Sequence, residues 1–144
     1  MLLGALMRAI ITDLHTRLTA ALPCPVLLPE QRELPLAGRK PGQSGGLGGY
    51  LAAHPGGYVQ LEDAQGISDD GVTAVWWVPV AALAPTAEQS DALAGQVRRL
   101  LCGSPRCPGP YTPTLPDTAR LVSPGVSLCR PSYQILSIDG VLAV

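Results

Sequence analysis

The sequence has 144 residues, of which 47% are hydrophobic and 15% are charged. Such a length fits one domain that buries a hydrophobic core without help from a metal or a disulfide, and the apolar content excludes a wholly disordered chain. Ten basic and eleven acidic residues leave a formal net charge of -1. This balance argues against a general nucleic-acid binder, because such proteins draw their affinity from many phosphate contacts.

The first predicted element is an amphipathic helix over residues 8–22. Ile10, Leu14, Leu18 and Leu22 recur every four residues and predict one buried stripe, and Pro23 stops the helix. Charged residues interrupt the apolar run, which is not typical of a signal peptide, and no stretch approaches the roughly 20 apolar residues of a membrane span. We therefore expect a soluble cytoplasmic protein whose residues 1–6 are loosely ordered.

A short apolar strand is expected over residues 24–28, followed by a flexible loop over about residues 30–56. This loop contains a glycine-rich run, residues 38–49, and the basic side chains of Arg32, Arg39 and Lys40. Glycine-rich loops hold phosphate where a helix begins directly after them, but no Lys-Ser/Thr pair follows the last glycine here and no helix is expected. The loop is predicted to be mobile, or to become ordered against a partner subunit.

Two strands are expected in the middle of the chain, with a solvated acidic connection over residues 63–71 between them. Residues 57–61 alternate between apolar and polar side chains, which predicts a half-buried strand. The strongest strand signal covers residues 72–82. Its core face is predicted to carry the apolar residues Val72, Ala74, Trp76, Val78 and Val80.

Trp77 lies on the opposite face of that strand, because neighbouring side chains of a strand point to opposite sides of the sheet. It therefore needs cover from a loop or from another chain, and aromatic residues are enriched in the cores of subunit interfaces. Pro79 has no N–H to donate to a neighbouring strand, which predicts an edge position or a bulge.

The last third of the chain is predicted to contain a helix, a loop and a terminal hairpin. Thr86 and Gln89 form a capping-box pattern at the start of a helix that Gly103 ends. A flexible proline-rich loop is expected over about residues 104–118, then a short strand over 120–122 and a hairpin whose Asp139-Gly140 turn is typical of type I′. The whole chain, residues 1–144, is predicted to form a single α+β domain with a mixed, mostly antiparallel sheet and two main helices packed on one face.

The candidate metal ligands are four cysteines and two histidines. Structural zinc sites usually use two close pairs of ligands, whereas only Cys102 and Cys107 lie near each other in the sequence, so reduced thiols are favoured over a zinc site completed by Cys24 and Cys129. The histidines lack a metal-binding spacing, and no serine lies in a strand-to-helix elbow. We expect no catalytic residue, no metal and no cofactor.

Four sequence segments carry a resemblance to a known family. They are AVWWVPVAAL at residues 74–83, TAEQSDALAGQVRRLLCG at residues 86–103, ARLVSPG at residues 119–125 and CRPSYQILSIDG at residues 129–140. In this order, after an opening amphipathic helix, they resemble the tail terminator proteins of tailed bacteriophages, in particular those of Mu-like phages and prophages.

The resemblance implies a structural protein and not an enzyme. Members of that family form a ring, expected here to be a homohexamer, that caps the tail tube, ends its polymerisation and forms the head–tail joint at the neck. The implied partners are copies of the chain and the tube, sheath and neck or connector proteins, without sequence-specific nucleic acid or membrane, in a virion assembled in the host cytoplasm. Candidate contact residues are Trp77, Arg32, Arg39, Lys40 and Tyr50.

Three other functions stay open at this point. The chain could be another neck or tail-completion component, or a small metal- or ligand-binding domain that uses the cysteines. It could also be an adaptor whose proline-rich residues 104–117 bind an aromatic groove on a partner.

Overall fold

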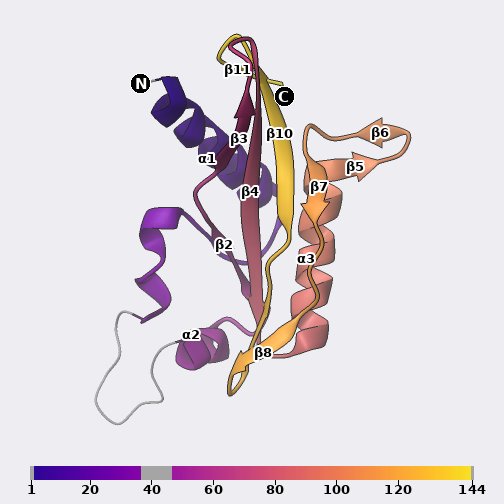
Figure 1. Ribbon diagram of the computed structural model, residues 1–144. Helices are drawn as coiled ribbons and strands as arrows, with labels where there is room; N and C mark the ends of the chain where they lie inside the picture. The colour runs from indigo at the N-terminus through magenta and orange to yellow at the C-terminus, as the bar shows by residue number, and fades with distance from the viewer. Residues whose placement is uncertain (1, 37–46, 144) are drawn as a thin grey trace.

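The computed structural model describes residues 2–36 and 47–143 (Figure 1). These residues form three α-helices, two short 3-10 helices, a mixed sheet of nine strands and a separate two-stranded hairpin. The predicted α+β class is confirmed. The helices are α1 (Leu2–Ala21), η1 (Pro29–Gln31), η2 (Leu34–Leu36), α2 (Leu47–Ala53) and α3 (Ala87–Cys102). The strands are β1 (Val26–Leu27), β2 (Tyr58–Leu61), β3 (Gln65–Asp69), β4 (Thr73–Ala84), β5 (Gly103–Ser104), β6 (Cys107–Pro108), β7 (Thr112–Leu115), β8 (Arg120–Ser123), β9 (Val126–Cys129), β10 (Ser132–Ile138) and β11 (Val141–Leu142).

The twelve-residue strand β4 is the centre of the sheet. It pairs in antiparallel fashion with β2 and β3 on one side and with β9 and β10 on the other. The parallel pair of β1 and β2 makes the sheet mixed. β7 and β11 extend the sheet beyond β10, and β8 extends it beyond β9.

The main hydrophobic core lies between the sheet and the helices α1 and α3, which pack on one face. In Figure 1, α1 passes behind β4 and β10. Ile10, Leu14 and Leu18 of α1 are fully buried, as the helical stripe predicts. Trp76 of β4 is 2% exposed, and its indole N–H donates to the Ser137 hydroxyl of β10 over 3.1 Å. The prediction that Trp76 anchors the core is confirmed.

A smaller core lies on the other face of the sheet, beneath α2. It contains Leu51 of α2 with Tyr58, Ala81, Leu83 and other apolar side chains. All four residues of β2 are buried, because Tyr58 packs with Leu51 of α2 and the Gln60 amide donates to the carbonyl oxygens of Leu28 and Leu61. The prediction of a half-buried strand is wrong for this reason.

Several segments that the sequence predicts to be irregular contain helices or strands. The helix α1 begins at Leu2, not at residue 8, and Leu6 is buried. The expected loop at 30–56 contains η1, η2 and the helix α2, while residues 37–46 lie outside the described part. Residues 104–118 contain β6 and β7, and β3 lies in the expected acidic connection.

The strands β3 and β7 form because a neighbouring strand is available, although their own compositions favour loops. β3 pairs with β4, and β7 pairs with β10. β7 is an edge strand that pairs with β10 alone among the described strands, so it needs N–H donors on one side only. Pro113, which has no N–H, is tolerated there for this reason.

Two positions on β4 differ from the predicted pattern. Val72 was expected in the core, but it precedes the strand at the turn and is 55% exposed. Pro79 was expected at an edge or bulge, but it lies in the central strand. On one edge of β4, Val80 pairs with Leu61 of β2 and Trp77 pairs with Gln65 of β3. Pro79 lies between these two pairs, where the neighbouring strand changes from β2 to β3, so its missing N–H costs no hydrogen bond between strands.

Local turn and cap chemistry follows the sequence closely. The Thr86 hydroxyl accepts the backbone N–H of Gln89 at 3.2 Å, and Gly103 ends α3 with a φ of 68°. Asp139 and Gly140 both have positive φ, 51° and 76°, as a type I′ turn requires. Both predictions are confirmed.

We predict that Thr86→Ala lowers the free energy of unfolding by about 1 kcal/mol, because the substitution removes the acceptor at the N-terminus of α3. Urea denaturation at neutral pH measures the change. Thr16→Ala, at an exposed position within α1, is the matched control and should not destabilise the protein, since alanine is the better helix former. An unchanged unfolding free energy in Thr86→Ala would contradict the role of the cap.

Candidate functional site

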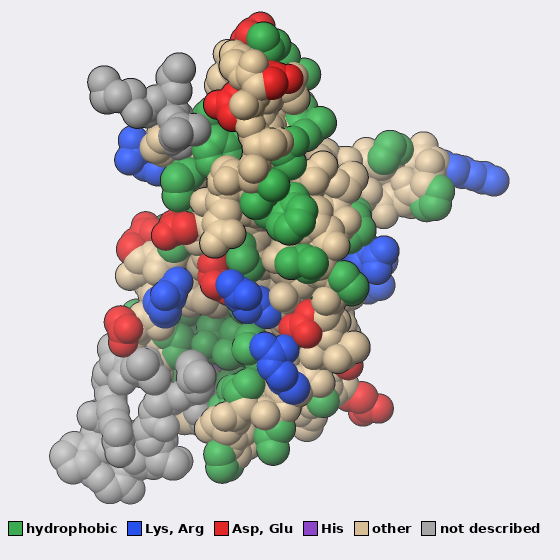
Figure 2. All heavy atoms as spheres, viewed as in Figure 1, with side chains coloured by type: hydrophobic (Ala, Val, Ile, Leu, Met, Phe, Trp, Pro, Cys, Tyr) green, Lys and Arg blue, Asp and Glu red, His purple; other side chains and the backbone are tan. Residues whose placement is uncertain are grey.

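The face of the sheet opposite α1 and α3 is the candidate functional surface, and we call it the open face. α2 covers one end of it. Over the rest, Val75, Trp77 and Pro79 of β4 are half-buried. Their neighbours on β10 are Leu136, paired with Val75 and 36% exposed, and Ile138, which is 50% exposed. Figure 2 looks onto this face and shows hydrophobic side chains gathered over the central strands.

Trp77 is held in place by a side chain of the next strand. Its indole N–H donates to Gln134 Oε1 at 3.0 Å, and Gln134 is its cross-strand partner on β10. The hydrogen bond satisfies the polar atom of the indole and leaves much of the ring for apolar contact. Trp77 therefore forms a fixed aromatic element in the middle of the open face, on the side that the sequence predicted.

A groove of about 350 Å³ lies further along the same face. Its lining includes the apolar residues Tyr58, Ala81 and Leu83 and the basic residues Arg32 and Arg130. Figure 2 shows the hollow, with hydrophobic side chains inside and basic ones beside it. Burial raises the pKa of Tyr58 to about 12, with a further contribution from Tyr50, so its phenol keeps its proton.

The predicted contact residues fall in two places on this face. Arg32 follows η1 and lines the groove. The Tyr50 ring meets the Tyr58 ring edge-on at 5.1 Å and stacks on His54 at 4.3 Å, so it is already engaged within the chain. Arg32 and Tyr58 thus line one groove and Tyr50 contacts Tyr58, whereas Trp77 lies further along β4. Arg39 and Lys40 lie outside the described residues.

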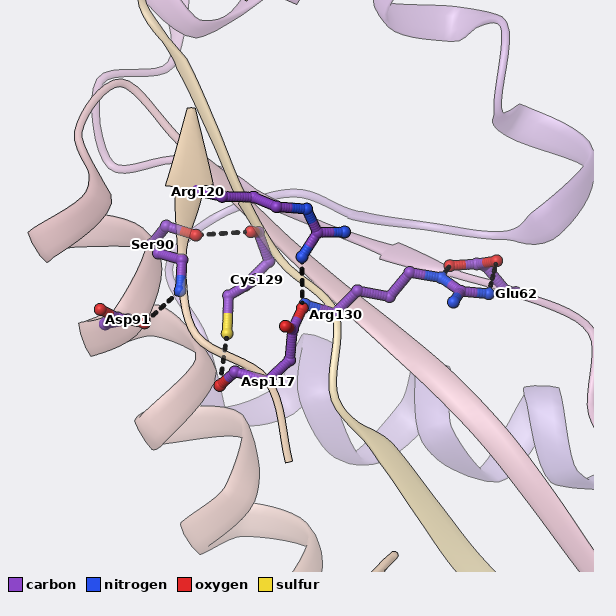
Figure 3. A network of polar contacts seen from close by, with 9 residues as sticks. Glu62, Ser90, Asp91, Asp117, Arg120, Cys129 and Arg130 are labelled. Carbon is purple, nitrogen blue, oxygen red and sulfur yellow. Dashed lines mark hydrogen bonds and ion pairs between the residues drawn. The ribbon is translucent and has the colours of Figure 1, made fainter. Parts of the chain in front are cut away.

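A polar network borders the groove (Figure 3). The Arg130 guanidinium donates to both oxygens of Glu62, at 2.5 and 2.7 Å. Asp117 Oδ2 accepts the backbone N–H of Arg130 at 2.7 Å and the Arg120 guanidinium at 2.9 Å. This network joins the ends of β2 and β9 to the segment before β8, and it fixes the rim next to the open face.

The ionisable groups of this network support a structural role. Burial raises the pKa of Asp117, but the hydrogen bonds from Arg130 and Arg120 outweigh burial and hold that pKa below its usual value. The Cys129 thiol donates to the carbonyl oxygen of Asp117 at 3.5 Å, and burial, with the nearby carboxylates of Asp117 and Asp91, raises its pKa to about 11. A protonated thiol is a poor nucleophile.

A second cleft, of about 410 Å³, lies between α3 and β7. Its acidic residues are Asp91 and Asp117, and each already accepts a backbone N–H, from Ala119 and Arg130 respectively. Both carboxylates therefore hold the chain segments around the cleft together.

The cysteines are unpaired thiols in the structure. Within residues 2–36 and 47–143, no three His, Cys, Asp or Glu side chains are grouped so that they could hold a metal ion. In the same residues, no helix is both long and apolar enough to cross a membrane.

Sequence reasoning identified Trp77 but missed Leu136 and Ile138 on the open face. The alternation within residues 132–138 carried the signal, but the register with β4 was needed to assign these residues to the side of Trp77. Arg130 and Glu62 were also missed, because 68 residues separate them in the chain.

Comparison with known proteins does not identify the chain. No family model matches it, and no curated protein is similar to it in sequence.

We predict that Asp117→Asn changes how stability depends on pH. The pKa of Asp117 is lower in the folded protein than in the unfolded chain, where it is about 3.9. Its carboxylate therefore stabilises the fold above that unfolded pKa, and this stabilisation is lost as the pH falls through the lower folded pKa. The variant should therefore be less stable than the wild type at pH 7, and this difference should shrink towards pH 3.

Urea denaturation at pH 7, 5 and 3 measures this profile. Asp63→Asn, which removes an exposed carboxylate, is the matched control and should follow the wild-type profile. A difference between Asp117→Asn and wild type that stays constant across the pH range would show that the carboxylate charge does not stabilise the fold.

Proposed function

We propose that this chain is a structural protein of a bacteriophage tail. It forms a ring of copies on the finished tail tube, ends polymerisation of the tube and joins the tail to the neck. In this role it is not an enzyme and needs no cofactor. Its partners are copies of itself, expected as a hexamer, and the tube, sheath and neck proteins of a virion assembled in the host cytoplasm.

The open face of the sheet is the observation that carries this proposal. Trp77, Val75 and Pro79 lie there beside the exposed side chains of Leu136 and Ile138. Contiguous apolar patches on a folded domain mark interaction sites, and a rigid aromatic side chain surrounded by smaller apolar ones is typical of the centre of a protein interface. A protein whose work is to fit against other subunits needs such a surface.

The order of elements gives a second line of support. An opening helix, the long strand β4, the capped helix α3 and the closing strand β10 follow one another as in the tail terminator family that the sequence resembles. A ring requires that two different surfaces of one subunit meet across each contact. The open face and the groove beyond it are candidates for one of these two surfaces.

We predict that Trp77→Ala weakens self-association of the protein by about 30-fold, as loss of a central aromatic contact worth about 2 kcal/mol would do. Sedimentation velocity over a range of protein concentrations measures the change, and circular dichroism confirms that the variant is folded. Leu121→Ala is the control, because Leu121 is 70% exposed on the hairpin of β8 and β9, away from Trp77.

The proposal as a whole is tested on tail tubes. Co-expression with the tube protein of the same phage or prophage should give tubes that end in a ring of this chain, visible by electron microscopy. A wild-type protein that remains a 15.0 kDa monomer at every concentration and does not bind tube ends would contradict the proposed function.

A further inference from the structure

The hairpin of β5 and β6 projects from the end of α3, away from the rest of the chain (Figure 1). Every residue from 103 to 108 is exposed. Arg106 is the one basic residue within this range, and Figure 2 shows a basic side chain at the outer end of the projection. We call residues 103–108 the arm.

The base of the arm has a defined geometry. Gly103 has a φ of 68°, and a Cβ atom there would collide with the carbonyl oxygen of Cys107. A Cβ atom on Gly109 would collide with the carbonyl oxygen of Leu101. The N–H of Gly109 donates to Cys102 at 2.8 Å, and the N–H of Tyr111 donates to Leu101 at 3.2 Å. These close backbone contacts fix the direction in which the arm leaves the domain.

An acidic end lies at another extremity of the molecule, where the β3–β4 and β10–β11 turns meet. The backbone N–H of Asp139 donates to the carbonyl oxygen of Val72 at 2.7 Å and joins the two turns. Asp69 is the last residue of β3, and Asp70 follows it in the first turn. Hydrogen bonds from Thr73 and Val72 lower the pKa of Asp70, so this carboxylate keeps its negative charge.

Exposed apolar side chains accompany these charges. Val72, Ile138 and Val141 are 55%, 50% and 68% exposed around the two turns. Figure 2 shows acidic and hydrophobic side chains together at this end of the molecule. The acidic end, defined as residues 69–72 and 138–141, therefore offers both negative charge and apolar surface to a partner.

The charges of the arm and of the acidic end are complementary. The carboxylates of Asp69 and Asp70 accept backbone N–H groups of their own turn, but no basic side chain of the described residues pairs with them. In the described part of the protein, the ion pairs join Asp13 to Arg17, Asp117 to Arg120 and Glu62 to Arg130. Arg106 and the three carboxylates of the acidic end stand outside these pairs. Because the arm and the acidic end lie at different extremities (Figure 1), their charges can meet only between two molecules.

We propose that the arm of one copy docks on the acidic end of the next copy, with Arg106 against the carboxylates and the arm prolines against Val72 and Val141. Two different surfaces meet in this contact, as closure of a ring by rotation requires. The inference rests on the self-assembly that the proposed function includes, and it names both surfaces of one contact between neighbouring copies.

Cross-linking through the native Cys107 tests the contact. Cys107 is exposed on the arm, so a short bis-maleimide that alkylates two thiols should link it to Val141→Cys of a neighbouring copy. We expect a ladder of covalent oligomers on a denaturing gel. Leu121→Cys, at a similarly exposed aliphatic position on a different hairpin, should give no more oligomer than the wild type, and adding Cys107→Ser should abolish the ladder of Val141→Cys.

Charge reversal gives an independent measurement. Arg106→Glu should weaken self-association at least tenfold by sedimentation velocity. Asp69→Lys in the same chain should restore part of the loss, because the introduced glutamate then faces an introduced lysine, while Asp70 and Asp139 remain. Arg8→Glu, at an exposed position on α1, makes the same change in net charge and should have no such effect.

The outcomes separate the two proposals. A wild type that assembles while Val141→Cys cross-links no better than Leu121→Cys, or while Arg106→Glu associates normally, overturns the docking of the arm and leaves the proposed function in place. A wild type that neither self-associates nor binds tube ends overturns both.

Discussion

Because successive side chains of β4 point to opposite faces, this one strand determines what each side of the domain does. Trp76, Val78 and Val80 are buried against α1 and α3, while Val75 and Trp77 belong to the open face. Strands pair with β4 along both of its edges, so it cannot shift register without moving Trp76 out of the core. The packing of the helices therefore also fixes the position of the contact surface.

The polar network beside the groove also fixes the chain segments at the edge of the open face. Glu62, Arg130 and Asp117 come from three segments that have no helix to hold them, yet each carboxylate accepts hydrogen bonds from a positively charged or backbone donor. Bidentate pairing of an arginine with a carboxylate restricts the orientation of both groups. The rim of the groove is thus as well defined as the strands beside it, and a subunit that meets this surface encounters a fixed shape.

Local chemistry made much of the fold predictable. The cap at Thr86 and the turn at Asp139-Gly140 depend on residues within a few positions of each other, and both form as expected. β3 and β7 were missed because their proline and glycine content favours loops, and long-range pairing with β4 and β10 overrides that preference. Trp77 could be assigned from its neighbour Trp76 alone, whereas Arg130 and Glu62 meet only in the folded chain.

The closing strand has a consequence for how the domain is made. β10 completes the sheet beside β4, and the hydrogen bond between Trp76 and Ser137 spans 61 positions of the chain. During synthesis, β4 therefore leaves the ribosome well before its neighbour β10 exists, with its edge unpaired and its apolar side chains in reach of other chains. Such long-range pairing slows folding, so the nascent protein passes through a stage in which premature association competes with completion of the subunit.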